Sequence, residues 1–347
     1  MTAAVNYGVI VPADQKPAEL VEFAVEIEAL GYGTLFHADE RFFRDVYTLL
    51  GPVANATTTL ELGPLTADPY SRHPAVQAMS IATLAEMSAG RAVLGIGPGS
   101  SGFHTIGIER SHVSTRLREA IELIRLLLIS TDNVTYRGET TSFINDRLGF
   151  GPIPRVPIEI GTRGPRLLRL AGTVADGVII GGYCSRPTVE WALEKIDAGL
   201  ASAGRSKAAL GVSVMVYAAV SDNASEARDA ARWGTLVALW SSLGRLDDLP
   251  LGAPVPDELI HYMETTQKSF HPEAMEPGMK LIPDSLLEPL SLAGTPDDCI
   301  RQLTDLLGAD GGGRISRIIL LPRPTAAQQP IDVVRRFAAE VIPFVEP

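Results

Sequence analysis

The chain has 347 residues, of which 46% are hydrophobic, and a formal net charge of −11. Its length and apolar content suffice for a large core, and its acidic balance argues against nucleic acid or an anionic membrane as a partner. Two widely separated cysteines, a start without the basic and apolar segments of a signal peptide, and apolar runs shorter than the roughly 20 residues of a membrane helix predict a cytoplasmic protein.

Strand and helix patterns alternate along the chain. The predicted strands are the apolar runs 7–11, 34–38, 60–65, 91–96, 158–161, 177–180, 210–219 and 315–320. The predicted helices are 18–29, 45–54, 75–87, 115–128, 165–174, 188–203, 224–243, 296–307 and 331–344. Eight strands alternating with helices predict an α/β fold class, specifically a (β/α)8 TIM barrel that occupies residues 1–347 as one domain.

Two segments interrupt the alternation. Residues 131–157 are rich in Gly, Asn and Pro and follow the fourth strand and its helix, and residues 244–289 carry many prolines and follow the seventh strand. Loops of this length inside a compact domain are often functional. We therefore expect insertions after strands 4 and 7 that shape a substrate pocket.

Ionisable side chains follow the second strand, in the run from His37 to Arg41. Because side chains alternate along a strand, His37 and Asp39 should point the same way, into the barrel mouth. A histidine beside the carboxylates Asp39 and Glu40 favours general acid–base catalysis near neutral pH. The alternative is a surface ion cluster with Arg41 and Arg44.

Glycine-rich loops follow the fourth, fifth and sixth strands. Glycine lets backbone approach a ligand, and free amides at a helix start favour anions, with Arg163 as an added cation. The candidate binding residues of these loops are Gly97, Pro98, Gly99, Ser100, Ser101, Gly161, Arg163, Gly164, Pro165, Gly181 and Gly182. Simple turns are the alternative. His104, just beyond the first of these loops, either faces the site or is a solvated histidine.

The third and fourth strands with their loops carry the most specific pattern. This block resembles the luciferase-like superfamily, and within it the branch that depends on the deazaflavin coenzyme F420, typified by methylenetetrahydromethanopterin reductase. The matching residues are Gly63-Pro64, Asp68-Pro69-Tyr70, Arg72, Pro74, Ala82-Thr83-Leu84, Ser88, Gly90-Arg91-Ala92 and Leu94-Gly95-Ile96-Gly97-Pro98-Gly99. Later matches are Gly107-Ile108-Glu109, Gly164-Pro165, Ala171-Gly172, Ala175-Asp176-Gly177 and Ala293-Gly294-Thr295-Pro296-Asp297-Asp298.

The resemblance implies how the deazaflavin lies across the carboxyl face of the barrel. Asp39 matches an aspartate that contacts the ring in the family, and Glu40 stands where a histidine is common. A bulge at Leu65, Thr66 and Ala67 would support the ring, with a non-proline cis peptide at Leu65–Thr66. An ordinary turn closed by Asp68 is the alternative. The glycine-rich loops would hold the phosphate-bearing tail.

The resemblance also implies the reaction, with two departures. The reductases have a glutamate in the first strand and an aspartate after the Gly-Pro-Gly loop, whereas residues 7–12 contain no acid and the second position is Ser100. Because these carboxylates lie near the pterin site in the family, the pterin is not the expected substrate.

We expect a homodimeric F420-dependent oxidoreductase that moves a hydride to or from a small organic substrate. Its candidate catalytic residues are His37, Asp39, Glu40 and His104. The alternatives are an FMN-dependent monooxygenase that uses oxygen and a flavin reductase partner, and a barrel that only binds a cofactor or partner. No metal-binding motif is recognisable in the sequence.

Overall fold

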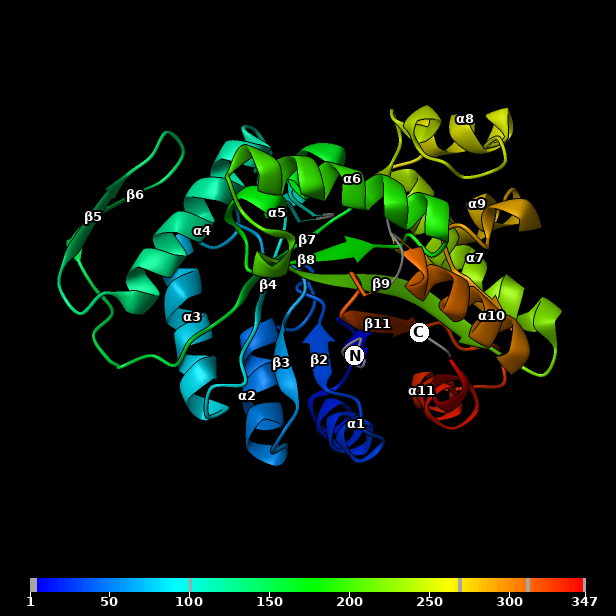
Figure 1. Ribbon diagram of the computed structural model, residues 1–347, viewed down its shortest axis with the longest axis horizontal. Coiled ribbons are helices and arrows are strands. Elements are labelled where there is room, and N and C mark those ends of the chain that lie inside the picture. Colours follow the sequence, from blue (N-terminus) through cyan, green and yellow to red (C-terminus); the bar gives the residue numbers. More distant parts are fainter. Residues whose placement is uncertain (1–4, 100–101, 268–269, 310–312, 346–347) are drawn as a thin grey trace.

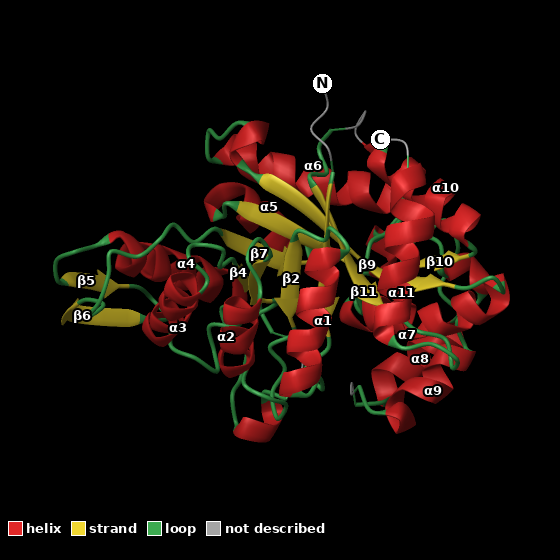
Figure 2. Ribbon diagram, turned by 90° about the horizontal axis from the view of Figure 1, so that it is seen from below, coloured by secondary structure: helices red, strands yellow, loops and turns green. Residues whose placement is uncertain are grey.

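The structure, a computed structural model, describes residues 5–99, 102–267, 270–309 and 313–345. Within these ranges, eight parallel strands form a barrel with helices on the outside (Figures 1 and 2). The strands are β1 (Asn6–Val11), β2 (Thr34–His37), β3 (Glu61–Pro64), β4 (Leu94–Ile96), β7 (Ile158–Thr162), β8 (Gly177–Gly181), β9 (Gly211–Val220) and β11 (Arg317–Pro322). They follow the order β3-β2-β1-β11-β9-β8-β7-β4, and bridges from Leu62 to Ala92 and from Ala67 to Ile96 join the two ends. The predicted TIM barrel is confirmed.

Helices connect successive barrel strands. They are α1 (Pro17–Ala29), α2 (Val46–Ala56), α3 (Pro74–Met87), α4 (Val113–Ile129), α5 (Pro165–Val174), α6 (Arg186–Ser202), α7 (Ala224–Ser241), α10 (Pro296–Leu307) and α11 (Pro330–Arg336). Proline begins several of them, because the first turn leaves its N–H positions unpaired in any case. The last predicted helix is interrupted: α11 ends at Arg336, and a π-helical turn (Phe337–Val341) and a 3-10 turn (Ile342–Phe344) follow.

The first insertion forms an antiparallel hairpin of β5 (Val134–Arg137) and β6 (Ser142–Asp146), which projects beside α3 and α4 (Figure 1). Glu119 of α4 holds the hairpin turn, because its carboxylate accepts 2.8 Å hydrogen bonds from the amides of Glu139 and Thr140. The interpretation of this segment as an irregular loop was incomplete. A surface hairpin with mostly exposed residues lacks the apolar strand pattern on which the prediction depended.

The second insertion contains α8 (Asp257–Thr265) and α9 (Pro272–Lys280). Proline inside α9 and the short length of both helices explain why no helical period was evident. A three-residue strand, β10 (Leu292–Gly294), follows and pairs with the end of β9. Short 3-10 turns also occur at His104–Ile106, Lys207–Ala209, Leu246–Asp248 and Asp284–Leu286.

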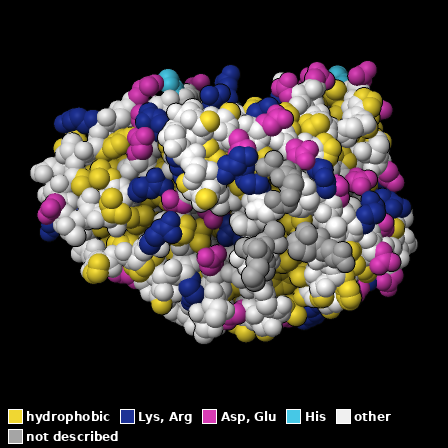
Figure 3. All heavy atoms as spheres, viewed as in Figure 1, with side chains coloured by type: hydrophobic (Ala, Val, Ile, Leu, Met, Phe, Trp, Pro, Cys, Tyr) yellow, Lys and Arg dark blue, Asp and Glu magenta, His cyan; other side chains and the backbone are white. Residues whose placement is uncertain are grey.

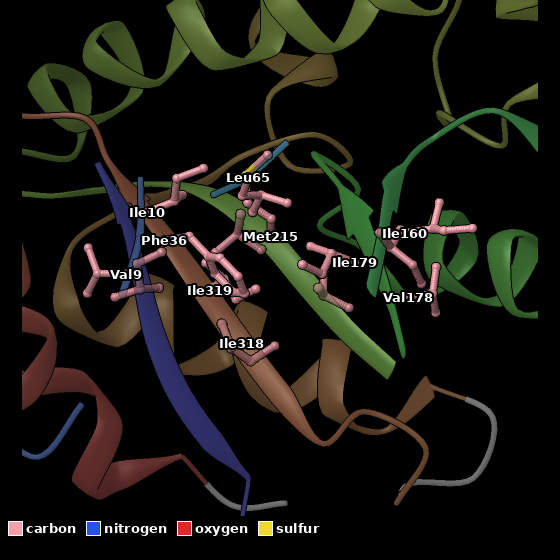
Figure 4. Packing of buried hydrophobic residues seen from close by; sticks show 14 of the residues in the cluster. Val9, Ile10, Phe36, Leu65, Ile160, Val178, Ile179, Met215, Ile318 and Ile319 are labelled. Atoms are coloured by element: carbon pink, nitrogen blue, oxygen red, sulfur yellow. The ribbon is translucent and has the colours of Figure 1, made fainter. Parts of the chain in front are cut away.

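Side chains fill the interior of the barrel. At its amino end, Arg317 of β11 forms a buried ion pair with Glu159 of β7 and donates a 3.0 Å hydrogen bond to Ser213 Oγ. Apolar side chains from several strands pack further along the barrel (Figure 4): Ile10, Phe36, Ile179, Met215 and Ile319. A filled barrel leaves the loops at the carboxyl ends of the strands as the place for a ligand.

Two further sequence expectations concern the cellular setting. Cys184 and Cys299 are both buried free thiols, as their separation predicted. No helix in the described ranges combines the length and apolarity needed to cross a bilayer. A cytoplasmic location stays a prediction.

Candidate active site

A cavity of about 1340 Å³ opens where the barrel strands end. Residues near or beyond the carboxyl end of each of the eight barrel strands line it, including Asp14, Asp39, Thr66, Gly99, Arg163, Gly181, Tyr217 and Arg323. Of the predicted site residues, the structure brings eleven together here. They are Asp39, Glu40, Leu65, Thr66, Pro98, Gly99, Gly161, Arg163, Gly164, Pro165 and Gly181.

Asp39 is the carboxylate with the most perturbed surroundings in this cavity. Burial, helped by the neighbouring charge of Asp68, raises its pKa to about 6, although the Arg72 guanidinium opposes the shift. Arg72 Nη1 lies 2.9 Å from Asp39 Oδ2. A carboxyl group with a pKa near 6 changes its protonation state close to neutral pH, so Asp39 is suited to acid–base chemistry.

The motif that contains Asp68 has a structural role. Its carboxylate accepts hydrogen bonds from the amides of Tyr70 at 2.8 Å and Ser71 at 2.7 Å, and pairs with Arg41 at 2.8 Å. Arg41 also contacts Glu40 at 3.4 Å. The ion cluster that was the alternative interpretation exists only in part: Arg41 pairs with Glu40 and Asp68 beside the cavity. Arg44 is not in it, because its Nη1 donates a 2.8 Å hydrogen bond to the carbonyl oxygen of Asp14.

The peptide bond between Leu65 and Thr66 is cis, as the resemblance implied. Three glycines pack against this bulge. A β-carbon on Gly95 would lie 2.5 Å from the carbonyl oxygen of Pro64, one on Gly97 would lie 2.9 Å from Thr66 Oγ1, and one on Gly161 would lie 2.4 Å from Thr66 Cγ2. These glycines therefore allow the neighbouring strands to approach the bulge.

His37 is not at the cavity, so its predicted orientation was wrong. Thr34 and Phe36 contact Arg317 inside the barrel, and alternation therefore directs the intervening and following side chains, His37 included, outward. The imidazole is fully buried, its Nδ1 lies 3.0 Å from the carbonyl oxygen of Ala38, and burial lowers its pKa to about 4. A neutral, enclosed histidine cannot reach a ligand in the cavity.

Four other predicted residues are also absent from the described lining. Ala67 is buried in the bridge to Ile96, and Gly97 packs behind the bulge as described. Gly182 adopts a φ of +68° behind Tyr217. His104 is exposed on a 3-10 turn, which agrees with the solvated alternative. Ser100 and Ser101 lie outside the described residues.

The wall formed by β7, β8 and α5 is suited to an anion. The helix α5 begins at Pro165. Its N-cap residue is Gly164, which has no side chain that could accept a hydrogen bond from the first turn. Arg163 stands beside this helix start, and its Nη2 lies 3.3 Å from the hydroxyl of Tyr217. Pro165 has no N–H, and the amides of Gly164 and Leu167 donate to Thr162 Oγ1 and to the carbonyl oxygen of Gly164. The helix dipole, the Arg166 amide and the Arg163 guanidinium therefore remain to attract phosphate or carboxylate.

Several lining residues escaped the sequence analysis. They are four arginines, Arg110, Arg166, Arg245 and Arg323, and five aromatic residues, Phe43, Tyr217, Trp233, Trp240 and Phe270. Arg323 directly follows the eighth strand, so the rule that strand ends carry function could have found it. Tyr217 lies within β9, and Phe43 and Arg110 lie in the loops after β2 and β4. The rest come from helices or the second insertion, and only folding brings them to the cavity.

In the described part of the chain, no group of three or more His, Cys, Asp and Glu side chains could hold a metal ion. The cavity instead combines carboxylates, arginines and aromatic rings around a bulged strand end. A filled TIM barrel with such a cavity is typical of barrel enzymes, which bind their ligands at the carboxyl ends of the strands. The chain belongs to the luciferase-like monooxygenase family, whose model matches residues 3–312.

Two named relatives are similar in sequence. A 5,10-methylenetetrahydromethanopterin reductase of Archaeoglobus fulgidus is 34% identical over 304 residues, which cover 87% of this chain and 90% of the relative. An F420-dependent glucose-6-phosphate dehydrogenase of Microbacterium testaceum is 33% identical over 222 residues, 60% of this chain and 66% of the relative. Relatives with two different substrates show that the family allows more than one reaction.

A solved structure supports the fold. The coenzyme F420 dependent tetrahydromethanopterin reductase of Methanopyrus kandleri superimposes with a TM-score of 0.81 over 99% of this chain and 100% of its own, at 22% identity. At this identity the likeness extends to the barrel architecture alone.

Proposed function

We propose that this protein is an F420-dependent oxidoreductase that transfers a hydride between the deazaflavin and a small organic substrate. One observation carries the proposal: a single cavity joins the Leu65–Thr66 bulge to the anion-binding wall at Arg163 and α5. The similarity of most of the chain to named F420-dependent enzymes and to methylenetetrahydromethanopterin reductases supports the same cofactor.

The residues present fit a flat ring with a phosphate-bearing tail. The cavity is large enough for both parts, with a wall of aromatic and aliphatic side chains. Arg245 also lines it, and its Nε is buried with no hydrogen-bond partner among the described residues. Buried donors are normally satisfied, so an orphaned guanidinium nitrogen favours an anionic ligand nearby.

When bound, the deazaflavin supplies a carbon centre that gives or accepts a hydride. The chain's own groups would bind, orient and exchange protons. Arg163, Arg245 and the Arg166 amide at the start of α5 would hold the tail, and the bulge at Leu65 and Thr66 would support the ring. The Asp39 carboxyl group would release or accept the proton that accompanies hydride transfer, since its pKa lies close to neutral pH.

An FMN-dependent monooxygenase is the second candidate, because the family to which the chain belongs carries that description. Titration of the purified protein with F420 and with FMN, followed by fluorescence, separates the two. Tight F420 binding with weak FMN binding is the expected result, and preference for FMN with oxygen consumption would replace the proposal. If the protein binds neither cofactor, the proposed oxidoreductase function is wrong.

Variants of the protein, measured in the same titration, test which residues bind the tail of F420. Arg163→Met should weaken F420 binding about tenfold or more, because a charge-assisted hydrogen bond contributes about 1.5–3 kcal/mol. Arg155→Met is the matched control, since the Arg155 side chain is 80% exposed and does not line the cavity. Equal affinities for both variants would contradict the assignment of the tail site.

We also propose a homodimer that associates through α3. Val76, Met79 and Met87 of this helix are 44%, 46% and 42% exposed. The inner face of α3 is also apolar, whereas a surface helix usually has a polar outer face. Hydrophobic side chains gather at the left of Figure 3, over the region of α3 and α4. A second copy of the chain would cover this face.

A further inference from the structure

Arg323 is a cation at the carboxyl end of β11 with a firmly held backbone. It stands between Pro322 and Pro324, whose rings restrict the local conformation, and its amide donates a 2.7 Å hydrogen bond to the carbonyl oxygen of Ala218 on β9. Its side chain lines the cavity. The guanidinium therefore projects from a fixed strand end rather than from a loose loop.

The charge of Arg323 has no close carboxylate partner in the described part of the chain, where Asp14 acts on it only at a distance. Its Nε is buried without a hydrogen-bond partner, and no ion pair joins it to a carboxylate anywhere in the described ranges. Burial lowers its pKa to about 10, so the side chain stays positively charged at neutral pH. A partly buried, unpaired cation that faces a cavity is costly unless a ligand anion completes it.

Aromatic rings support this guanidinium from one side. Arg323 Cζ lies 4.0 Å from the centre of the Trp233 indole, and the Trp233 ring lies 5.8 Å from that of Phe270. Trp233 also packs edge-on against Tyr217 at 6.2 Å. A cation stacked on an indole keeps its edge available for a planar or tetrahedral anion, and the rings beside it suit an apolar ligand body.

The position of Arg323 separates it from the bulge that would support the cofactor ring. In the closed order β3-β2-β1-β11-β9-β8-β7-β4, β11 lies opposite β4. The bulge that would support the ring follows β3, and the wall that would hold the tail begins at β7, so both flank β4 rather than β11. A ligand group at Arg323 would therefore lie across the cavity from the bulge, on the far side of Tyr217 and Trp233 from Arg163. The proposal assigns this place to a second molecule that shares the cavity.

We propose that the substrate of this enzyme carries an anionic group, a carboxylate or a phosphate, next to an apolar body, and that Arg323 binds this group with its guanidinium supported by Trp233. This inference rests on the proposed oxidoreductase function and specifies the substrate class for that site. The neighbouring Phe270 ring would contact the apolar part. Neutral analogues of the substrate would leave the guanidinium unpaired and bind weakly.

Calorimetric titration of the F420-loaded protein with matched probes tests this assignment. Benzoate against benzamide, and phenyl phosphate against phenol, differ mainly in charge. We expect the anionic member of at least one pair to bind more tightly, and Arg323→Met to weaken that member about tenfold to a hundredfold, as loss of a charge-assisted pair predicts. Which pair responds distinguishes carboxylate from phosphate.

Controls separate this role from folding and from cofactor binding. Arg323→Lys should recover part of the affinity, and Arg155→Met should change nothing, while F420 affinity and the melting temperature stay as in the parent protein. If Arg323→Met does not fold, Arg323→Gln takes its place. Anionic and neutral probes that bind alike, no binding of any probe, or an Arg323 variant that loses F420 instead would overturn the proposal.

Failure of the proposed function has a different signature. If the parent protein does not bind F420, the function is wrong, whereas the probe titration on the same protein still decides whether Arg323 binds an anion. A parent protein that binds F420 but ignores the charge of the probes contradicts only the substrate class.

Discussion

Arg72 and Asp39 form an ion pair with 2.9 Å between Arg72 Nη1 and Asp39 Oδ2. The same guanidinium also contacts Asp45, the residue that caps α2 through a 2.9 Å hydrogen bond from Thr48 N. One side chain from the loop after β3 thus joins the loop after β2 to the start of the next helix. Because Asp39 lines the cavity, this contact positions the candidate proton carrier.

Replacement of Arg72 by Met should impair this positioning. The guanidinium lowers the pKa of Asp39, so its loss should raise that pKa further above about 6 and move the acidic limb of the pH–rate profile upward. We expect kcat to fall about tenfold or more while F420 affinity changes little. Arg72→Lys should restore part of both effects, and an unchanged pH profile would contradict the positioning role.

Replacement of Asp39 by Asn should change stability with pH. The folded protein holds the pKa of Asp39 at about 6, above the 3.8 of an unperturbed aspartate, so folding favours the protonated form. The carboxylate therefore costs stability above pH 4, increasingly up to about pH 6. Asn, which cannot ionise, should raise the free energy of unfolding by up to about 2–3 kcal/mol at pH 7 and hardly at all at pH 4.

Urea unfolding at pH 4 and pH 7 measures this difference for the cofactor-free protein. In the pH–rate profile, the Asp39→Asn variant should also lose the change in activity near pH 6. A stability difference of constant size at both pH values would show that the Asp39 carboxyl group titrates normally, and the acid–base role would lose its support.

Replacement of Gly97 by Ala should disturb the bulge. The added methyl would lie 2.8 Å from the carbonyl oxygen of Gly161 and 2.9 Å from Thr66 Oγ1, so one strand must move. We expect a loss of about 1–3 kcal/mol in stability together with weaker F420 binding. Gly211→Ala is the matched strand control, because its methyl would lie 3.9 Å from the nearest backbone atom. Equal melting temperatures and affinities for the two variants would refute the packing role.

Replacement of Met79 by Glu should dissociate the proposed dimer. A charge in the centre of an apolar interface is unpaired and costly, so sedimentation should shift from dimer toward monomer. Ile129→Glu provides the control, since Ile129 is 73% exposed at the far end of α4. A parent protein that sediments as a monomer, or a Met79→Glu dimer, would argue against association through α3.

The barrel was predictable because its strands are buried on both faces. Continuous apolar runs such as β8 and β9 are bounded by Gly, Asp or Pro, and each alternates with a helix pattern. The hairpin β5–β6 and the strand β10 were not predicted, each for a different reason. The hairpin is mostly exposed and lacks an apolar period, and β10 is only three residues long.

Some residues of the candidate site could also be predicted from the sequence. A strand-end rule found Asp39, Glu40 and Arg163, because a parallel barrel brings all carboxyl ends to one rim. It failed for His37, the last residue of β2, whose side chain falls on the outward face of the strand. A shift of one residue reverses the direction of a strand side chain, and sequence does not set that register accurately.

The sequence by itself determined the barrel, the family and the glycine-rich block at the third and fourth strands, because local apolar patterns and short motifs encode them. Only the tertiary structure decided which charges share the cavity. Arg72 meets Asp39 across 33 positions, and Arg323 stacks on Trp233 across 90. Such pairs depend on strand register and helix packing, which arise from interactions throughout the chain, so no local pattern records them.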